Sequence, residues 1–170
     1  DMLLEELQKL EKQFPQYALS NSPTTRVGGG ISKNFKTVSH RYPMLSLSNS
    51  YSKEDIADFE KRAQKLVDGD IEFVCELKYD GCAIGLTYKD GMLDQALTRG
   101  DGSKGEEVTA NVRTIRTIPL QLHGDYPKEF EIRGEIYFPL EKFAALNHQR
   151  KANNEPTFMN PRNTASGTLK

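Results

Sequence analysis

A lysine stands between two carboxylates in the run Cys75-Glu76-Leu77-Lys78-Tyr79-Asp80-Gly81. Lys78 has the same parity as Glu76 and Asp80, so in an extended strand these three side chains leave the sheet on one face. Gly81 follows and would let a substrate phosphate approach the backbone closely. The spacing therefore suggests a site for a phosphate-bearing ligand. The alternative is a solvated strand face, whose exposed ion pairs contribute only about 0–1 kcal/mol each.

Two later runs carry residues of similar chemistry. In Arg99-Gly100-Asp101-Gly102, the guanidinium of Arg99 can offer a bidentate fork to a phosphate or ribose, although an exposed arginine in a turn is the alternative. Glu131, Arg133 and Glu135 alternate along a predicted strand and so share one face, where carboxylates suit ribose hydroxyls and metal ions. The run 101–105 resembles an anion-binding turn but lacks full P-loop spacing, and we interpret it as the cap of a following helix.

The hydrophobic periodicity predicts the elements that position these residues. A helical period runs from Leu3 to Phe14 and stops at Pro15, and a second helix begins at a capping box formed by Ser52 and Asp55. Residues 71–77 alternate as a half-buried strand does. A hairpin with strands 83–88 and 92–98 follows, then a short helix near 108–115, a strand over 130–138 and a helix from 140 to about 152. The mixed order predicts an α+β fold with antiparallel sheets and flanking helices.

Turn-forming residues and a glycine run between residues 20 and 30 indicate a hinge or linker. We therefore predict a domain boundary there, with residues 1–33 as the end of a small helical subdomain and residues 34–170 as the main domain. The chain opens inside a helical pattern and stops in what reads as the start of another helix. This pattern predicts a protein that continues beyond both ends.

Composition narrows the class of protein. The chain has 170 residues, of which 36% are hydrophobic and 28% charged, which is typical of one folded domain in water. The net charge of −1 lacks the basic footprint of nucleic-acid binding, so other parts of the protein must help to hold any DNA partner. Cys75 and Cys82 are the only cysteines, so neither a zinc site nor a disulfide framework is expected. The absence of a long apolar run and of a basic signal region predicts a cytoplasmic protein without membrane contact.

The motifs follow a recognisable order. Lys-x-Asp-Gly, then Arg-Gly-Asp-Gly, then Arg-Gly-Glu resembles the covalent nucleotidyltransferases, which include DNA ligases, RNA ligases and messenger-RNA capping enzymes. The flanking motifs are similar to those of the bacterial NAD-dependent DNA ligases over nearly the whole chain: Ser22-Pro23-Thr24, Arg26-Val27-Gly28, His40-x-x-Pro43-Met44-Leu45-Ser46-Leu47-Ser48-Asn49, Phe158-x-Asn160-Pro161-Arg162-Asn163 and Ala165-x-Gly167. The chain departs from the family pattern at Ser48, where Asp is usual, and at Lys170, where Arg is usual.

The resemblance implies a fold and a set of roles. The fold would be the nucleotidyltransferase core, related to ATP-grasp ligases. Lys78 would be the adenylated lysine. Glu76 and Arg99 would contact the adenosine moiety or its phosphate, Glu135 the ribose, and Ser46 and Leu47 would make further nucleotide contacts. Asp1 would belong to the nicotinamide mononucleotide subdomain, Arg162 would meet DNA phosphate or the nucleotide, and Asp80 is a candidate ligand for Mg²⁺.

The implied reaction is attack of the Lys78 amine on the α-phosphate of NAD, with release of nicotinamide mononucleotide and transfer of AMP to the 5′-phosphate of nicked double-stranded DNA. A lysine in water is protonated at neutral pH, and Glu76 and Asp80 favour that form, so Mg²⁺ or the family's later lysines must activate it. Those lysines belong to motifs beyond Lys170, so we expect residues 1–170 alone to adenylate poorly. We separately expect a monomer. The alternatives are an ATP-dependent ligase or capping-type enzyme, and a non-catalytic adenine-nucleotide-binding module.

Overall fold

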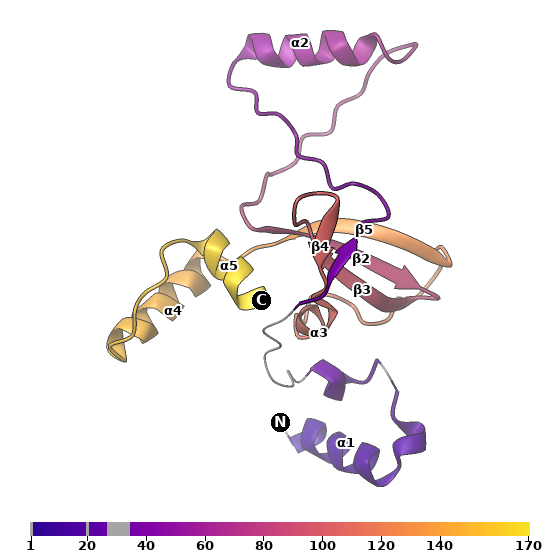
Figure 1. The fold of residues 1–170 in the computed structure, drawn as a ribbon, viewed down its shortest axis with the longest axis vertical. Coiled ribbons are helices and arrows are strands. Elements are labelled where there is room, and N and C mark those ends of the chain that lie inside the picture. The colour runs from indigo at the N-terminus through magenta and orange to yellow at the C-terminus, as the bar shows by residue number, and fades with distance from the viewer. Residues whose placement is uncertain (1, 20, 27–34) are drawn as a thin grey trace. The chain divides into compact units, whose positions relative to one another are not determined.

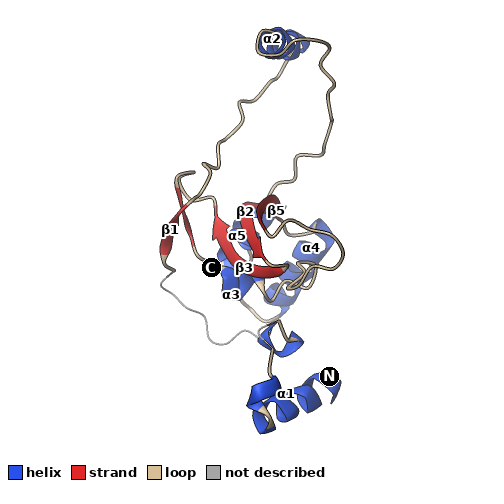
Figure 2. Cartoon of the chain, turned by 90° about the vertical axis from the view of Figure 1, so that its right-hand side faces the viewer, coloured by secondary structure: helices blue, strands red, loops and turns tan. Residues whose placement is uncertain are grey.

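The computed structural model describes the chain except for residues 1, 20 and 27–34. Its contacts divide the chain into two compact units. Unit 1 contains residues 1–44 and 80–170, and unit 2 contains residues 45–79. Figure 1 and Figure 2 show the helices and strands of both units.

The centre of unit 1 is a three-stranded antiparallel sheet in the order β3-β2-β5 (Figure 1). It is formed by β2 (Cys82–Lys89), β3 (Met92–Thr98) and β5 (Glu129–Ile136). The predicted hairpin is confirmed, because Asp90 and Gly91 both adopt a positive φ, of 48° and 77°, between β2 and β3. Such angles match the twist of adjoining strands. The predicted third strand is also confirmed, since β5 pairs with the whole length of β2.

One face of this sheet carries the core. Ile84 and Tyr88 of β2 and Ala96 of β3 are buried together with Val112 of α3 (Thr109–Val112) and Leu169 of α5 (Pro161–Leu169). The Tyr88 ring stacks on Phe130 at 5.5 Å. The other face carries Thr87, Glu131 and Arg133, so the sheet is amphipathic, as alternation along its strands requires.

A second, two-stranded sheet pairs β1 (Thr37–Ser39) with β4 (Lys104–Glu106). β4 corrects one prediction, because the turn at 101–105 leads into this strand and not into a helix; the short helix α3 begins later. The turn is closed by the Asp101 carboxylate, and the chain then pairs with β1 as a strand. The local sequence predicted the turn, but it could not reveal that the residues after the turn pair with β1.

The other helices described in unit 1 are α1 (Met2–Gln13), η1 (Pro15–Tyr17), η2 (Pro23–Arg26) and α4 (Leu140–Ala152), where η marks a 3₁₀ helix. The predicted helices near residues 3–14 and 140–152 are confirmed. Asp1 and the expected boundary near residue 33 lie outside the described residues. None of the described helices is long and apolar enough to span a bilayer.

Unit 2 contains one helix, α2 (Lys53–Gln64). Its capping box is confirmed: Asp55 N–H donates to Ser52 Oγ at 3.1 Å, and Ser52 N–H donates to Asp55 Oδ2 at 3.1 Å. The strand predicted for residues 71–77 is wrong, because residues 70–80 form neither helix nor strand. Alternation shows which side chains could share a face, but a strand also needs a partner for its backbone hydrogen bonds, and no described strand pairs with it.

Candidate active site

Residues from four separate sequence motifs meet where the chain enters β2. Gly81 N–H donates to Glu135 Oε1 at 3.1 Å, and Arg162 Nη1 lies 3.4 Å from Asp80 Oδ1. Arg99 N–H donates to the carbonyl oxygen of Ala83 at 3.2 Å, and Ala83 is directly opposite Glu135 in the β2–β5 pairing. We call Asp80, Arg99, Glu135 and Arg162 the motif cluster.

Gly81 fixes the chain at this point by close packing. A Cβ added to it would lie 2.2 Å from the carbonyl oxygen of Ile136 and 2.9 Å from the Cα of Tyr137, both of which are backbone atoms. A residue with a side chain could be accommodated only if the ends of β2 and β5 separated. The Asp-Gly pair that follows Lys78 and Tyr79 is therefore an anchor for the chain.

Arg162 lies in the first turn of α5, whose N-terminus is capped by Asn160: its Oδ1 accepts a hydrogen bond from Asn163 N–H at 2.7 Å. The preceding loop is tied to α4, because Asn147 exchanges two hydrogen bonds with the backbone of Phe158, at 2.8 and 3.0 Å. The side chains of Arg162 and Asp80 are 58% and 77% exposed, so their ion pair contributes only about 0–1 kcal/mol. A phosphate could therefore recruit this guanidinium at little cost.

The Arg-Gly-Asp-Gly motif builds a tight turn. Asp101 Oδ1 accepts hydrogen bonds of 2.8 Å from Lys104 N–H, from the Ser103 hydroxyl and from Ser103 N–H. These bonds, with that from Lys104 first, lower the pKa of Asp101 to about 2. Gly100 and Gly102 have φ values of 57° and 93°, which favour glycine. Asp101 and both glycines thus have structural roles, and they hold Arg99 at the surface.

Comparison with known proteins identifies two families that match this chain. Residues 32–170 match the family described as NAD-dependent DNA ligase adenylation domain, and residues 1–28 match the family described as DNA ligase-like, N-terminal NAD⁺-binding domain. The chain belongs to the NAD-dependent DNA ligase family. Among its relatives, the DNA ligase of Bacteroides fragilis is 59% identical, and those of Cytophaga hutchinsonii and Christiangramia forsetii are each 54% identical. Each comparison covers 100% of this chain, and the chain spans 26% of the length of each relative.

Apart from Asp1, the other predicted site residues of this ligase-family chain lie in unit 2. Ser46, Leu47, Glu76 and Lys78 are all exposed and stand in irregular backbone on either side of α2. The expected common strand face of Glu76, Lys78 and Asp80 is not formed, since none of the three is in a strand. Of the eight predicted site residues that lie in the described part of the chain, four belong to the motif cluster of unit 1 and four lie in unit 2.

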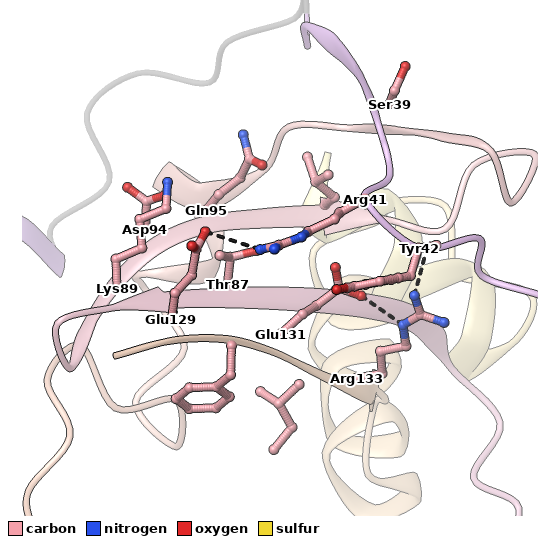
Figure 3. A pocket seen from close by; sticks show the side chains of 13 residues that line it. Ser39, Arg41, Tyr42, Thr87, Lys89, Asp94, Gln95, Glu129, Glu131 and Arg133 are labelled. Atoms are coloured by element: carbon pink, nitrogen blue, oxygen red, sulfur yellow. Dashed lines mark hydrogen bonds and ion pairs between the residues drawn. The ribbon is translucent and has the colours of Figure 1, made fainter. Parts of the chain in front are cut away.

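A cavity of about 800 Å³ lies over the polar face of the sheet in unit 1. Figure 3 shows that its charged side chains are turned toward one another. Arg41 pairs with Glu129 at 3.4 Å, Lys89 with Asp94 at 2.7 Å, and Arg133 with Glu131 at 2.8 Å. It contains no member of the motif cluster. Because its charges compensate one another, this cavity has no net charge to attract a nucleotide phosphate.

Sequence reasoning placed Arg133 on the correct face but gave it no role. Its Nη1 and Nη2 donate to the carbonyl oxygens of Pro43 and Tyr42, at 2.9 and 2.7 Å. His40 Nε2 lies 3.0 Å from the carbonyl oxygen of Arg99. No sequence signal could have revealed these contacts, because the acceptors are backbone carbonyls far away in the chain, which every residue possesses.

Proposed function

We propose that the chain is the adenylation part of an NAD-dependent DNA ligase and that Lys78 is its nucleophile. The observation that carries the proposal is the convergence of Lys-Tyr-Asp-Gly, Arg-Gly-Asp-Gly, Arg-Gly-Glu and Asn-Pro-Arg-Asn at the start of β2. Because the chain belongs to the ligase family, we interpret this convergence as a site for adenylation. We also propose that residues 34–170 adopt the nucleotidyltransferase core related to ATP-grasp ligases.

The anchored Asp80 supports a role for Lys78 near the motif cluster. Two peptide links separate the residues, so the Cα atoms of Lys78 and Asp80 are at most about 7 Å apart in any arrangement of the two units. A lysine side chain has a flexible four-carbon stem. We propose that this amine attacks a phosphate bound by the guanidinium groups of Arg99 and Arg162.

In the proposed first step, the unprotonated Lys78 amine attacks the α-phosphorus of NAD. A P–N bond forms as the bond from this phosphorus to the bridging oxygen breaks, nicotinamide mononucleotide leaves with the electron pair, and the amine loses its proton to solvent. The 5′-phosphate of nicked double-stranded DNA then takes AMP from the lysine. In the last step, the 3′-hydroxyl attacks that phosphate to form the phosphodiester bond, and AMP leaves.

The proposed nucleotide contacts follow from the chemistry of each side chain. A carboxylate has about four lone-pair sites, so the single N–H bond from Gly81 leaves Glu135 the capacity to accept from ribose hydroxyls. Arg99 and Arg162 offer the fork that matches phosphate oxygens. Ser46, Leu47 and Glu76 would complete the adenosine site, and Asp1 the site for the nicotinamide half. Arg162 also remains a candidate contact for DNA phosphate.

The carboxylates of the site could hold a magnesium ion only together with the phosphates of the substrate. The described residues contain no group of three or more His, Cys, Asp and Glu side chains that could hold a metal. Mg²⁺ commonly binds through one or two carboxylates together with substrate phosphates, and the exposed Asp80 is the candidate carboxylate. Bound there, Mg²⁺ would neutralise phosphate charge. We further propose that the protein acts as a monomer in the cytoplasm and that residues 1–33 belong to the nicotinamide-binding subdomain.

The proposal is tested by intact-protein mass spectrometry of the full-length enzyme, a protein as long as the related DNA ligases. Incubation with NAD and Mg²⁺ should add one AMP to the protein, and peptide mapping should locate it on Lys78. Lys78→Ala should abolish the adduct, whereas Lys65→Ala, which removes another exposed lysine of unit 2, should not. An adduct that survives Lys78→Ala would disprove the nucleophile. Efficient labelling from ATP but not from NAD would instead favour the ATP-dependent alternative.

A further inference from the structure

The segment Tyr42–Met44 is the point at which the chain leaves unit 1 for unit 2. It lies against two of the sequence motifs at once. Arg133 of β5 binds it on one side, and the turn 99–102 binds it on the other. Ser46 and Leu47, the proposed nucleotide contacts, follow directly along the chain. Only Leu45 separates this segment from Ser46 in the sequence.

Arg133 holds the segment with a complete fork. Its Nη1 donates to Pro43 O at 2.9 Å and its Nη2 to Tyr42 O at 2.7 Å. Its Nε donates to Glu131 Oε1 at 2.8 Å (Figure 3). The Glu131 side chain is only 15% exposed, so it orients the guanidinium from a fixed position. A planar guanidinium can make these three contacts together, whereas a lysine offers a single flexible cation.

The turn 99–102 holds the other side of the segment. Met44 N–H donates to the carbonyl oxygen of Gly102 at 2.8 Å, and the Met44 side chain is buried. A Cβ on Gly102 would lie 2.9 Å from Met44 O, so the glycine allows this approach. Met44 Sδ lies 3.8 Å from the position that a Cβ on Gly85 would take, which places the methionine over β2.

We propose that Arg133 is a positioning residue for NAD binding, acting through the segment Tyr42–Met44 on Ser46 and Leu47. This inference rests on the proposed function. We call the three hydrogen bonds of Arg133 the clamp. Ordering a binding segment before the ligand arrives lowers the entropy lost on binding, so the affinity for NAD depends on the clamp even though Arg133 itself need not touch the ligand. The clamp affects binding of NAD more than the chemistry at Lys78, because Lys78 is followed by its own anchor at Gly81.

The test measures adenylation kinetics of the full-length enzyme with NAD. Arg133→Gln should raise KM for NAD about tenfold, equivalent to about 1.4 kcal/mol, and leave kcat within about twofold. Arg133→Lys should recover part of the loss, because an ammonium group can still donate to one of the two carbonyl oxygens. Hydrogen exchange at the Met44 amide should accelerate in both variants, while exchange at the Leu86 amide in β2 stays unchanged. This local effect would distinguish lost positioning from general destabilisation.

Arg41→Gln is the matched control. Arg41 is in the same stretch of chain and pairs with Glu129 at 3.4 Å on the same face, but it does not hold the carbonyl oxygens of Tyr42 and Pro43. Its KM should stay at the wild-type value. The inference is wrong if Arg133→Gln leaves KM unchanged, if Arg41→Gln raises KM equally, or if KM rises without faster exchange at Met44.

Two further outcomes are separable. If Arg133→Gln fails to fold, Arg133→Lys decides by the same measurements. If the wild-type enzyme itself takes up no AMP on Lys78, the proposed function fails and this inference falls with it. If the wild-type enzyme adenylates normally and Arg133→Gln changes neither KM nor exchange at Met44, only the positioning role is refuted.

Discussion

Gly81→Ala is the most informative change to the proposed site. The structure indicates how much it should lower the free energy of unfolding, and it provides a matched control. The new Cβ would lie 2.2 Å from Ile136 O, and this backbone atom cannot move without disturbing β5. Overpacking of this kind costs about 1–3 kcal/mol. Separation of β2 from β5 would also weaken the hydrogen bond from Gly81 to Glu135, at about 1 kcal/mol.

The combined loss of about 3 kcal/mol corresponds to a fall of about 6–12 °C in unfolding temperature for a domain of this size. Gly134→Ala is the control, since a Cβ there meets nothing within 4 Å. It also removes a flexible glycine from a strand, so it should be neutral or stabilising by about 0.5–1 kcal/mol. Scanning calorimetry of the full-length enzyme would compare the two midpoints of the adenylation domain.

The same two variants test the link to function. Gly81→Ala should slow AMP uptake at a temperature well below its midpoint, because the anchor two residues after Tyr79 has moved, whereas Gly134→Ala should react as the wild type does. The packing argument fails if the two variants unfold within about 2 °C of each other. The functional link fails if Gly81→Ala is destabilised as expected but takes up AMP at the normal rate.

Three further predictions follow. Glu135→Gln retains an acceptor for the backbone N–H, so calorimetry should show little loss of stability, while KM for NAD rises because the charge is lost. Asp101 has a folded pKa of about 2, set first by the Lys104 N–H, against 3.8 in an unfolded chain. Its stabilisation is therefore present above about pH 4 and is lost toward pH 2, so the difference in unfolding temperature between wild type and Asp101→Asn should shrink over that window. Burial raises the pKa of the Cys82 thiol, so mass spectrometry should find it alkylated more slowly than the exposed Cys75.

Elements specified by neighbouring residues were predicted correctly, and so was β5, which has β2 as its partner. Ser52 and Asp55 cap α2 within one turn, and Asp90 with Gly91 forms the hairpin turn from its own backbone angles. The strand at 71–77 was predicted from alternation alone, but strand formation depends on a partner that local sequence does not reveal. The pairing of β1 with β4 was missed for the same reason.

The site was predictable as a set of motifs but not as a geometry. Asp80 and Arg162 are 82 residues apart in the chain, and nothing in either motif indicates that they pair. The order of motifs identified the family, and with it the candidate residues. The contacts that anchor those residues depend on tertiary packing, so they could be found only in the folded chain.

The structure separates the motif residues that secure the backbone from those proposed to contact the nucleotide. Gly81, Asp101 and Arg133 secure the backbone, although each belongs to a motif that also contains a proposed nucleotide contact. Loss of adenylation on substitution at such a position therefore does not identify a contact with NAD. An anchor should change unfolding temperature or local exchange as well as activity, whereas Lys78, exposed and outside any helix or strand, should change activity alone. Measuring stability and kinetics on the same variants separates these two roles within one motif.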